Sequence, residues 1–197
     1  QKLTQSRTHT RFIAFPRHRH DFIEMMYVCK GSCTHIIDGQ EITVQAGEFL
    51  LLNQYSWHEI KKAEKDDISV NFVIRPEFFD NPYTMLGFNN VITDFLINVL
   101  RKNSSQGEFL YFQVADAVPV QNLIENMVFM LIHDQENDTI LQTTMGLLCM
   151  HLAYYTDRLN RGVQKKFDDM LVKESMEYID SHFQHASLTE LADKLHQ

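Results

Sequence analysis

The hydrophobic pattern of this chain changes its period near residue 80, and this change limits the possible folds more than any other sequence feature. Before it, short apolar runs separated by turn residues cover residues 22–28, 34–37, 40–44, 49–52 and 68–74. Asp38-Gly39 lies between two of these runs, and both of its residues accept the positive φ angles of a tight hairpin. The pattern predicts a small antiparallel β-barrel, or a β-sandwich, over residues 1–80.

Beyond residue 80 the apolar spacing becomes that of amphipathic helices. Asn81-Pro82 is typical of a helix start, because asparagine can cap the first turn and proline is tolerated there. A later helix is indicated by one apolar face, made of Val120, Leu123, Ile124, Met127, Val128 and Leu131. We therefore predict an α+β chain in which residues 81–162 form a helical segment.

A further helix, beyond Asp138, carries apolar residues at alternating spacings of four and three. They are Leu141, Met145, Leu148, Leu152, Tyr155 and Leu159. This is the a/d pattern with which helices pack side by side. The seam either packs on the core of its own chain or joins two copies as a homodimer, and the sequence leaves both alternatives open.

Residues 163–197 are predicted to be a linker followed by the start of another domain. Residues 170–180 have the spacing of a new amphipathic helix. Residues 187–190 (Ser-Leu-Thr-Glu) form a capping box, in which Ser187 and Glu190 each accept a hydrogen bond from a backbone N–H. The next helix is expected to continue towards the last residue.

The composition is ordinary for a globular protein, with 44% hydrophobic and 22% charged residues. No run approaches the roughly 20 apolar residues that span a bilayer, and we find no secretory leader, so a cytoplasmic protein without membrane contact is expected. The net charge of −8 argues against DNA binding by these residues, since phosphate contacts need clustered Lys and Arg. Cys29, Cys33 and Cys149 are expected to be buried free thiols.

The densest group of chemically active residues lies in residues 18–24, with the sequence HRHDFIE. On one strand, His18, His20 and Glu24 would point to the same side, because even numbers of residues separate them. Imidazole and carboxylate groups suit a divalent transition metal such as Fe, Mn, Ni or Zn, and His58 could supply a fourth ligand. The alternatives are a polar cluster whose members satisfy one another, or contacts to an organic ligand.

The spacing H-x-H-x3-E-x6-G, formed by His18, His20, Glu24 and Gly31, resembles the latter part of the first cupin motif. Gly47, followed by His58, is similar to the second motif. The resemblance covers about residues 10–75. It implies a cupin-like antiparallel β-barrel whose pocket lies at these residues.

Downstream, residues 178–183 (YIDSHF) and 187–192 (SLTELA) resemble the phrase that opens the first helix-turn-helix of AraC-family transcription regulators. This resemblance implies a cupin-like effector-binding domain in residues 1–80 and a dimerisation segment in residues 81–162. Residues 163–197 would be a linker and the first helices of a truncated helix-turn-helix DNA-binding domain. The chain would then be the effector-sensing part of a regulator and not an enzyme. A small molecule in the barrel would modulate DNA binding by the missing C-terminal part.

The expected effector-binding residues are His18, His20, Glu24, Trp57 and His58. Trp57, the single tryptophan, adjoins His58 at the predicted barrel rim. Its ring could stack on a flat ligand or a sugar, a common effector class of such regulators, or it could pack in the core. The regulator needs no cofactor. The alternative is a metal-dependent cupin enzyme, an oxygenase or isomerase, that uses His18, His20, Glu24 and His58 as metal ligands.

Overall fold

The computed structural model describes residues 4–8, 12–87, 90–100, 106–133 and 137–163, together with Ser175, Tyr178, Ile179 and Ser187. The chain divides into two compact units, Gln1–Val163 and Gln164–Gln197. In the second unit, the Ser187 backbone N–H donates to the Tyr178 hydroxyl at 3.4 Å. The rest of the predicted linker, the helix at 170–180 and the start of the helix-turn-helix lie outside the described residues.

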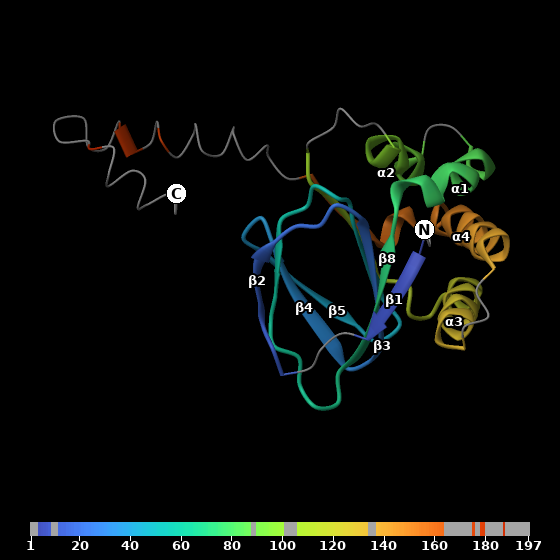
Figure 1. Ribbon diagram of the computed structural model, residues 1–197, viewed down its shortest axis with the longest axis horizontal. Coiled ribbons are helices and arrows are strands. Elements are labelled where there is room, and N and C mark those ends of the chain that lie inside the picture. The colour runs from blue at the N-terminus through green and yellow to red at the C-terminus, as the bar shows by residue number, and fades with distance from the viewer. Residues whose placement is uncertain are drawn as a thin grey trace. The chain divides into compact units, whose positions relative to one another are not determined.

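The strands of the described residues form two antiparallel sheets (Figure 1). They are β1 (Thr4–Thr8), β2 (Phe15–His18), β3 (Ile23–Lys30), β4 (Ser32–Ile37), β5 (Gln40–Gln45), β6 (Phe49–Leu52), β7 (His58–Ile60), β8 (Ile68–Ile74), β9 (Glu108–Phe112) and β10 (Leu159–Val163). The larger sheet has the order β1-β8-β3-β6-β9-β10 and the smaller one β2-β7-β4-β5. No ladder joins the sheets within this part of the chain, so the arrangement is two sheets rather than the expected closed barrel.

The hairpin between β4 and β5 forms at the predicted dipeptide. Asp38 and Gly39 have φ angles of 53° and 74°, as a two-residue turn of this kind requires. Ile37 then pairs with Gln40, and the register continues along both strands. Along β4, buried and half-buried residues alternate, so one face of the smaller sheet is turned away from the core.

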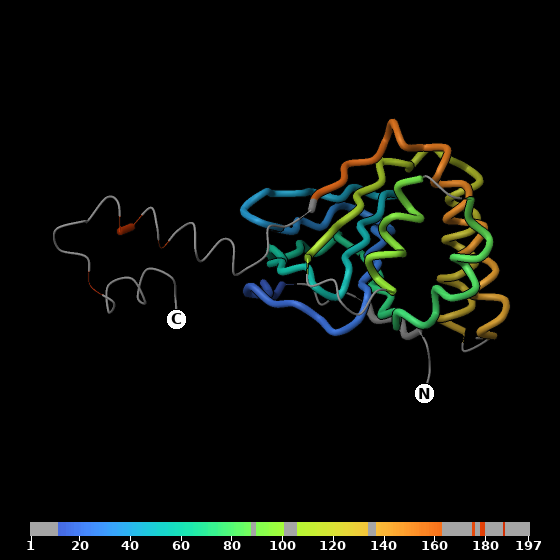
Figure 2. The backbone as a smooth tube through the Cα atoms, turned by 90° about the horizontal axis from the view of Figure 1, so that it is seen from above, coloured from blue at the N-terminus to red at the C-terminus, as the bar shows by residue number. Residues whose placement is uncertain are grey.

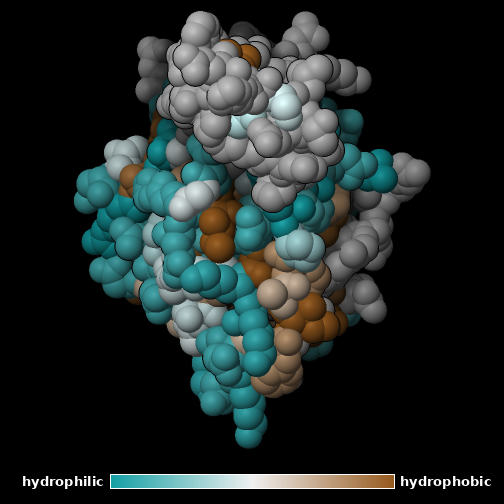
Figure 3. Space-filling model, turned by 90° about the vertical axis from the view of Figure 1, so that its left-hand side faces the viewer, coloured by the Kyte–Doolittle hydropathy of each residue, from teal (hydrophilic) through white to brown (hydrophobic). Residues whose placement is uncertain are grey.

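The face of the molecule drawn in Figure 3 is largely hydrophilic, with hydrophobic atoms gathered in a limited area.

Strand β3 is buried on both faces because it lies between two cores. Met26 and Val28 belong to the core shared with residues of β4, β5 and β7 of the smaller sheet. Met25 and Tyr27, on the other face, belong to the core shared with the helices. This double burial explains the apolar run of residues 25–28.

The helices cover one face of the larger sheet (Figures 1 and 2). They are α1 (Asp80–Met85), α2 (Val91–Leu100), α3 (Val118–Ile132) and α4 (Asp138–Leu152), preceded by a 3-10 turn at Pro76–Phe79. The helix predicted to start at Asn81-Pro82 is the short α1, and α2 follows it as a separate helix. The Asn137 side chain caps α4 by accepting a hydrogen bond from the Ile140 N–H. In the described residues, no helix has the length and hydropathy needed to cross a membrane.

The apolar seam predicted on α4 packs on the core of its own chain. Leu141, Met145, Leu148 and Leu152 are all buried there. The rest of the predicted seam does not continue the helix, since α4 ends at Leu152 and Leu159 begins β10. The segment predicted as helical also contains β9, and both late strands extend the larger sheet.

All three cysteines are free thiols, but their burial differs from the expectation. Cys33 and Cys149 are buried. Cys29 is exposed, because the burial of β3 ends one residue before it.

Candidate functional site

His18, His20, Glu24 and His58 meet at one place, although they do not share a strand. His18 ends β2, Glu24 lies in β3, and His20 lies in the connection between these strands. His18 and His58 are cross-strand partners in the smaller sheet. Nitrogen atoms of the three histidines lie within 4.8 Å of one another. The prediction of convergence is therefore confirmed, but a turn produces it rather than the alternation of a single strand.

Glu24 lies at the bottom of this cluster, and only 3% of the residue is exposed. Its Oε2 is 3.3 Å from His20 Nε2 and 3.4 Å from His58 Nε2. Its Oε1 accepts a hydrogen bond from Asn71 Nδ2 at 2.6 Å. Burial by itself raises the pKa of Glu24, but the imidazoles of His20 and His58 outweigh it and hold that pKa well below its usual range. The carboxylate is therefore ionised at neutral pH.

The ring of His18 is oriented by its own strand. Its Nδ1 is 2.7 Å from the Pro16 carbonyl, which can only accept, so Nδ1 carries the proton and Nε2 keeps its lone pair. Burial lowers the pKa of His18, and the neighbouring imidazoles of His58 and His20 lower it further, against the opposing effect of the Pro16 hydrogen bond. A neutral imidazole held at one nitrogen by a backbone carbonyl is the form that binds metal ions.

The donor set fits a divalent transition metal. His58 Nε2 and Glu24 Oε2 are buried, and neither makes a well-aligned hydrogen bond within the described residues. Buried polar atoms without such partners are uncommon and costly, and a cation among the imidazoles would satisfy both. Bound there, a metal would supply Lewis acidity. A polar group of an organic ligand could satisfy the same atoms.

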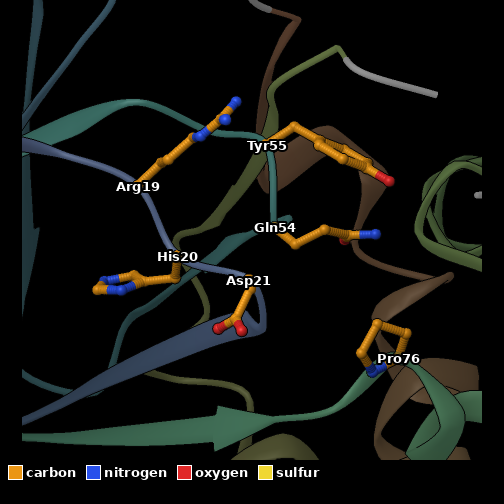
Figure 4. A pocket seen from close by; sticks show the side chains of 6 residues that line it. All are labelled: Arg19, His20, Asp21, Gln54, Tyr55 and Pro76. Carbon is orange, nitrogen blue, oxygen red and sulfur yellow. The ribbon is translucent and has the colours of Figure 1, made fainter.

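A cleft of about 810 Å³ opens beside the cluster (Figure 4). Its lining comes from the loop after β2, the loop before β7 and the start of the 3-10 turn, and consists of Arg19, His20, Asp21, Gln54, Tyr55 and Pro76. His20 belongs to both places, since it lines the cleft and its Nε2 approaches Glu24. A ligand in the cleft could therefore contact the buried cluster through His20.

Trp57 lies apart from the histidines, although it precedes His58. The guanidinium groups of Arg17 and Arg19 are 5.4 Å and 5.2 Å from the centre of its ring. Both arginines thus contact this ring, whereas the three histidines lie close to one another. Trp57 is half-buried and does not line the cleft. Its predicted contact with an effector stays a prediction.

Two residues that contact the site, Asn71 and His35, were not among the predicted effector or metal contacts. Asn71 reaches Glu24 from β8, and its only distinguishing feature is a polar side chain inside an apolar run. His35 is fully buried on β4, with its Nε2 3.2 Å from Met26 Sδ and its ring 5.4 Å from that of His58. These roles depend on pairing between distant strands.

Comparison with solved structures shows the fold. An apo lysine-to-alanine variant of ToxT from Vibrio cholerae is 12% identical, with a TM-score of 0.53, over 100% of this chain and 72% of that one. ToxT with a bound unsaturated fatty acid is 14% identical, with a TM-score of 0.47, over 99% and 69%. A cupin-2 domain protein from Shewanella frigidimarina is 24% identical, with a TM-score of 0.34, over 38% and 74%.

Comparison of sequences identifies the family. No curated protein is significantly similar to the chain. The AraC-like ligand binding domain, however, matches residues 4–148, which include most of the helical layer and every strand of the two sheets except β10. The resemblance seen in the sequence is thereby confirmed, and the chain belongs to the AraC-like ligand binding domain family.

Proposed function

We propose that this chain is the effector-sensing and dimerisation part of an AraC-type transcription regulator. A small molecule binds in the cleft and changes DNA binding by the C-terminal domain. The observation that carries the proposal is the family match over residues 4–148, in a chain whose cleft shares His20 with a buried polar cluster. Ligand domains of this family sense rather than catalyse, and the protein would act in the cytoplasm.

The proposed effector contacts are His18, His20, Glu24, Trp57 and His58. His20 reaches the cleft directly, while His58 and Glu24 lie behind it with polar atoms that lack aligned hydrogen-bond partners in the described chain. A hydroxyl or amino group of the effector would satisfy these atoms. Because the alternative partner of the same atoms is a metal ion, the two occupants would compete.

We assign DNA binding to the helix-turn-helix that begins within residues 163–197 and to the sequence expected to follow it. A net charge of −8 makes phosphate contacts by this chain unfavourable. An effector bound by the first unit would change the affinity for DNA by altering how two such domains are held. Coupling free energies of this kind typically change an affinity by about 5- to 150-fold.

The homodimer would use the outward face of α4, since the inward seam is buried in its own chain. Exposed residues on this face, here named the outer stripe, are Ile140, Thr143, Leu147 and Met150, with Tyr154 just beyond the helix. Their spacings alternate between three and four, as in the seam of two packed helices. An exposed apolar stripe of this length is a typical site of association.

Analytical ultracentrifugation tests the dimer. Leu147→Arg places a charge in the centre of the outer stripe and should yield a monomer at micromolar concentration, whereas the wild type sediments as a dimer. Asn126→Arg adds the same charge on an exposed position of α3 and serves as the control, which should stay dimeric. A monomeric wild type, or a dimer that survives Leu147→Arg, would exclude the outer stripe as the interface.

A metal-dependent cupin enzyme is the second candidate function. It is favoured by one observation: three histidine nitrogens lie within 4.8 Å of one another, with Glu24 against two of the rings. In that case His18, His20, Glu24 and His58 would be the ligands, and the cleft would hold the substrate.

Native mass spectrometry of the chain beside its His18→Ala variant separates the two functions. The sensor proposal expects a dimer without stoichiometric metal, empty or with an organic ligand. One metal per subunit, lost in His18→Ala, would support the enzyme instead. For the full-length protein, we expect a ligand to change the affinity for a selected DNA fragment in a fluorescence anisotropy assay. A protein that binds no DNA but turns over the ligand would refute the regulator.

A further inference from the structure

We propose that the effector of the cleft is a small organic acid that also carries hydroxyl or amino groups. Its carboxylate would bind Arg19, and one of its donors would bind Gln54 Oε1. The inference rests on the proposed sensing function and names the chemical class of ligand that this site would take. It also replaces the general expectation of a sugar with a charged ligand.

Arg19 provides the positive end of the cleft. The only contact of its guanidinium with the described residues is the ring of Trp57, at 5.2 Å, and no carboxylate pairs with it. Its N–H donors are therefore available, while the aromatic ring restricts the side chain. A planar guanidinium in this state is suited to a carboxylate, which accepts two parallel hydrogen bonds from it.

Gln54 provides an acceptor that lacks a donor. Its Nε2 donates to the Val99 carbonyl at 2.9 Å, which fixes the orientation of the amide. Its Oε1 is buried and has no hydrogen-bond partner in the described chain. A buried acceptor without a donor is unfavourable, so a hydroxyl or amino group of a ligand would gain a hydrogen bond and remove this cost.

The two ends of the cleft offer a ligand different groups. In Figure 4, Arg19 and Tyr55 lie towards one end of the cleft, Asp21 and Pro76 towards the other, and Gln54 between them. The Tyr55 hydroxyl has no hydrogen bond with the described residues and can join Arg19 as a donor. The Asp21 carboxylate, at the other end, can accept from a hydroxyl or ammonium group.

This lining disfavours two other ligand classes. A fatty acid could pair with Arg19, but it has no hydroxyl or amino donor and would leave the buried Gln54 Oε1 unsatisfied. A neutral sugar could bind Gln54 and Asp21, but it would form no charge-assisted pair with the exposed Arg19.

Ligand-observed NMR of the 197-residue chain at millimolar ligand concentration tests the class. The probes are D-gluconate and D-galacturonate, L-glutamate, the neutral D-galactose, and hexanoate. We expect binding by at least one of the hydroxy or amino acids and none by galactose or hexanoate. Galactose lacks the carboxylate of galacturonate, so it is the control for the positive end of the cleft. Hexanoate has a carboxylate but no hydroxyl groups, so it is the control for the acceptors of the cleft.

Calorimetry then assigns the contacts. Arg19→Gln should weaken the acid that binds by about 10- to 100-fold, because it removes a charge-assisted pair. Arg17 also contacts Trp57 but does not line the cleft, so Arg17→Gln should leave the affinity unchanged. Gln54→Leu should weaken binding by about 5- to 10-fold.

Three results would overturn the inference: no acid binds, galactose or hexanoate binds instead, or the acid binds Arg19→Gln as tightly as the wild type. Binding of galactose or hexanoate would leave the sensor proposal standing. If the chain binds one metal per subunit and no ligand changes the affinity of the full-length protein for DNA, the sensor proposal itself is refuted.

Discussion

The ion pair between Arg161 and Glu108 holds the last strand of the first unit, and it makes the sharpest test of the packing there. Arg161 Nε, on β10, donates to Glu108 Oε1, on β9, at 2.6 Å. The side chain of Glu108 is only 2% exposed, and that of Arg161 is 34% exposed. Glu108 Oε2 accepts from Asn98 Nδ2, on α2, at 3.0 Å. Arg161→Ala would leave a buried carboxylate with a single side-chain donor.

The magnitude follows from this burial. Removing one partner of a fully buried pair costs about 3–5 kcal/mol. Arg161 is one-third exposed, so water can partly replace it, and we expect the free energy of unfolding to fall by about 2–3 kcal/mol. For a domain of this size, such a loss lowers the thermal midpoint by roughly 4–12 °C.

Urea unfolding at pH 7, followed by the fluorescence of the single tryptophan, measures the loss. Arg158→Ala is the matched control, because Arg158 pairs with an exposed Asp116 carboxylate and should cost less than about 1 kcal/mol. The double variant Glu108→Gln/Arg161→Ala should be no less stable than Arg161→Ala, since the uncompensated charge is gone. If Arg161→Ala costs no more than the control, Glu108 is solvated and the reasoning from its burial is wrong.

Two further predictions concern a turn and the thiols. Gly47→Ala should destabilise the protein by about 2–4 kcal/mol in the same assay, because Gly47 has a φ of 82° and a Cβ there would lie 2.8 Å from a neighbouring side chain. Gly39→Ala is the control, since Gly39 has a φ of 74° but open space around it, and it should cost about 1 kcal/mol. Equal losses in the two variants would contradict the close packing at Gly47. At pH 8, a thiol reagent should modify the exposed Cys29 in the folded protein and reach the buried Cys33 and Cys149 only on unfolding. Burial raises the pKa of all three thiols, to about 12 for Cys33 and Cys149, so the difference in rate comes mainly from access; equally fast modification of all three would contradict the burial of Cys33 and Cys149.

Five strands of the first half, β3, β4, β5, β6 and β8, could be predicted because each is a short apolar run that ends at a turn residue. Strands β1, β2 and β7 carry no such run and were not predicted. The hairpin at Asp38 and Gly39 also depends only on local backbone preference. The late strands β9 and β10 were not predicted either. In the sequence, β9 precedes α3 and β10 follows α4, yet the two strands pair with each other, and β9 also pairs with β6. Strand β10 carries no apolar run, whereas β9 contains one at residues 109–112 that the prediction of a helical segment over residues 81–162 overlooked.

The candidate site shows the same division between local and distant information. The H-x-H-x3-E spacing correctly indicates that His18, His20 and Glu24 converge, even though a turn interrupts the expected strand. The partners Asn71 and Gln54 come from other parts of the chain, and their hydrogen bonds arise only when the sheets and α2 pack together. Residue types at a suggestive spacing can thus propose a cluster, but burial and hydrogen-bond accounting show which atoms still need a ligand.

Helix α4 explains why the apolar period alone left the dimer question open. The sequence carries two stripes at spacings of three and four on this helix, one centred on Met145 and Leu148, the other on Leu147. A period shows that a face exists, but not whether its partner is the same chain or another copy. The first stripe is buried against the chain's own core, so it cannot also join two copies. The proposed dimer, if it uses this helix, would therefore need an exposed surface such as the outer stripe.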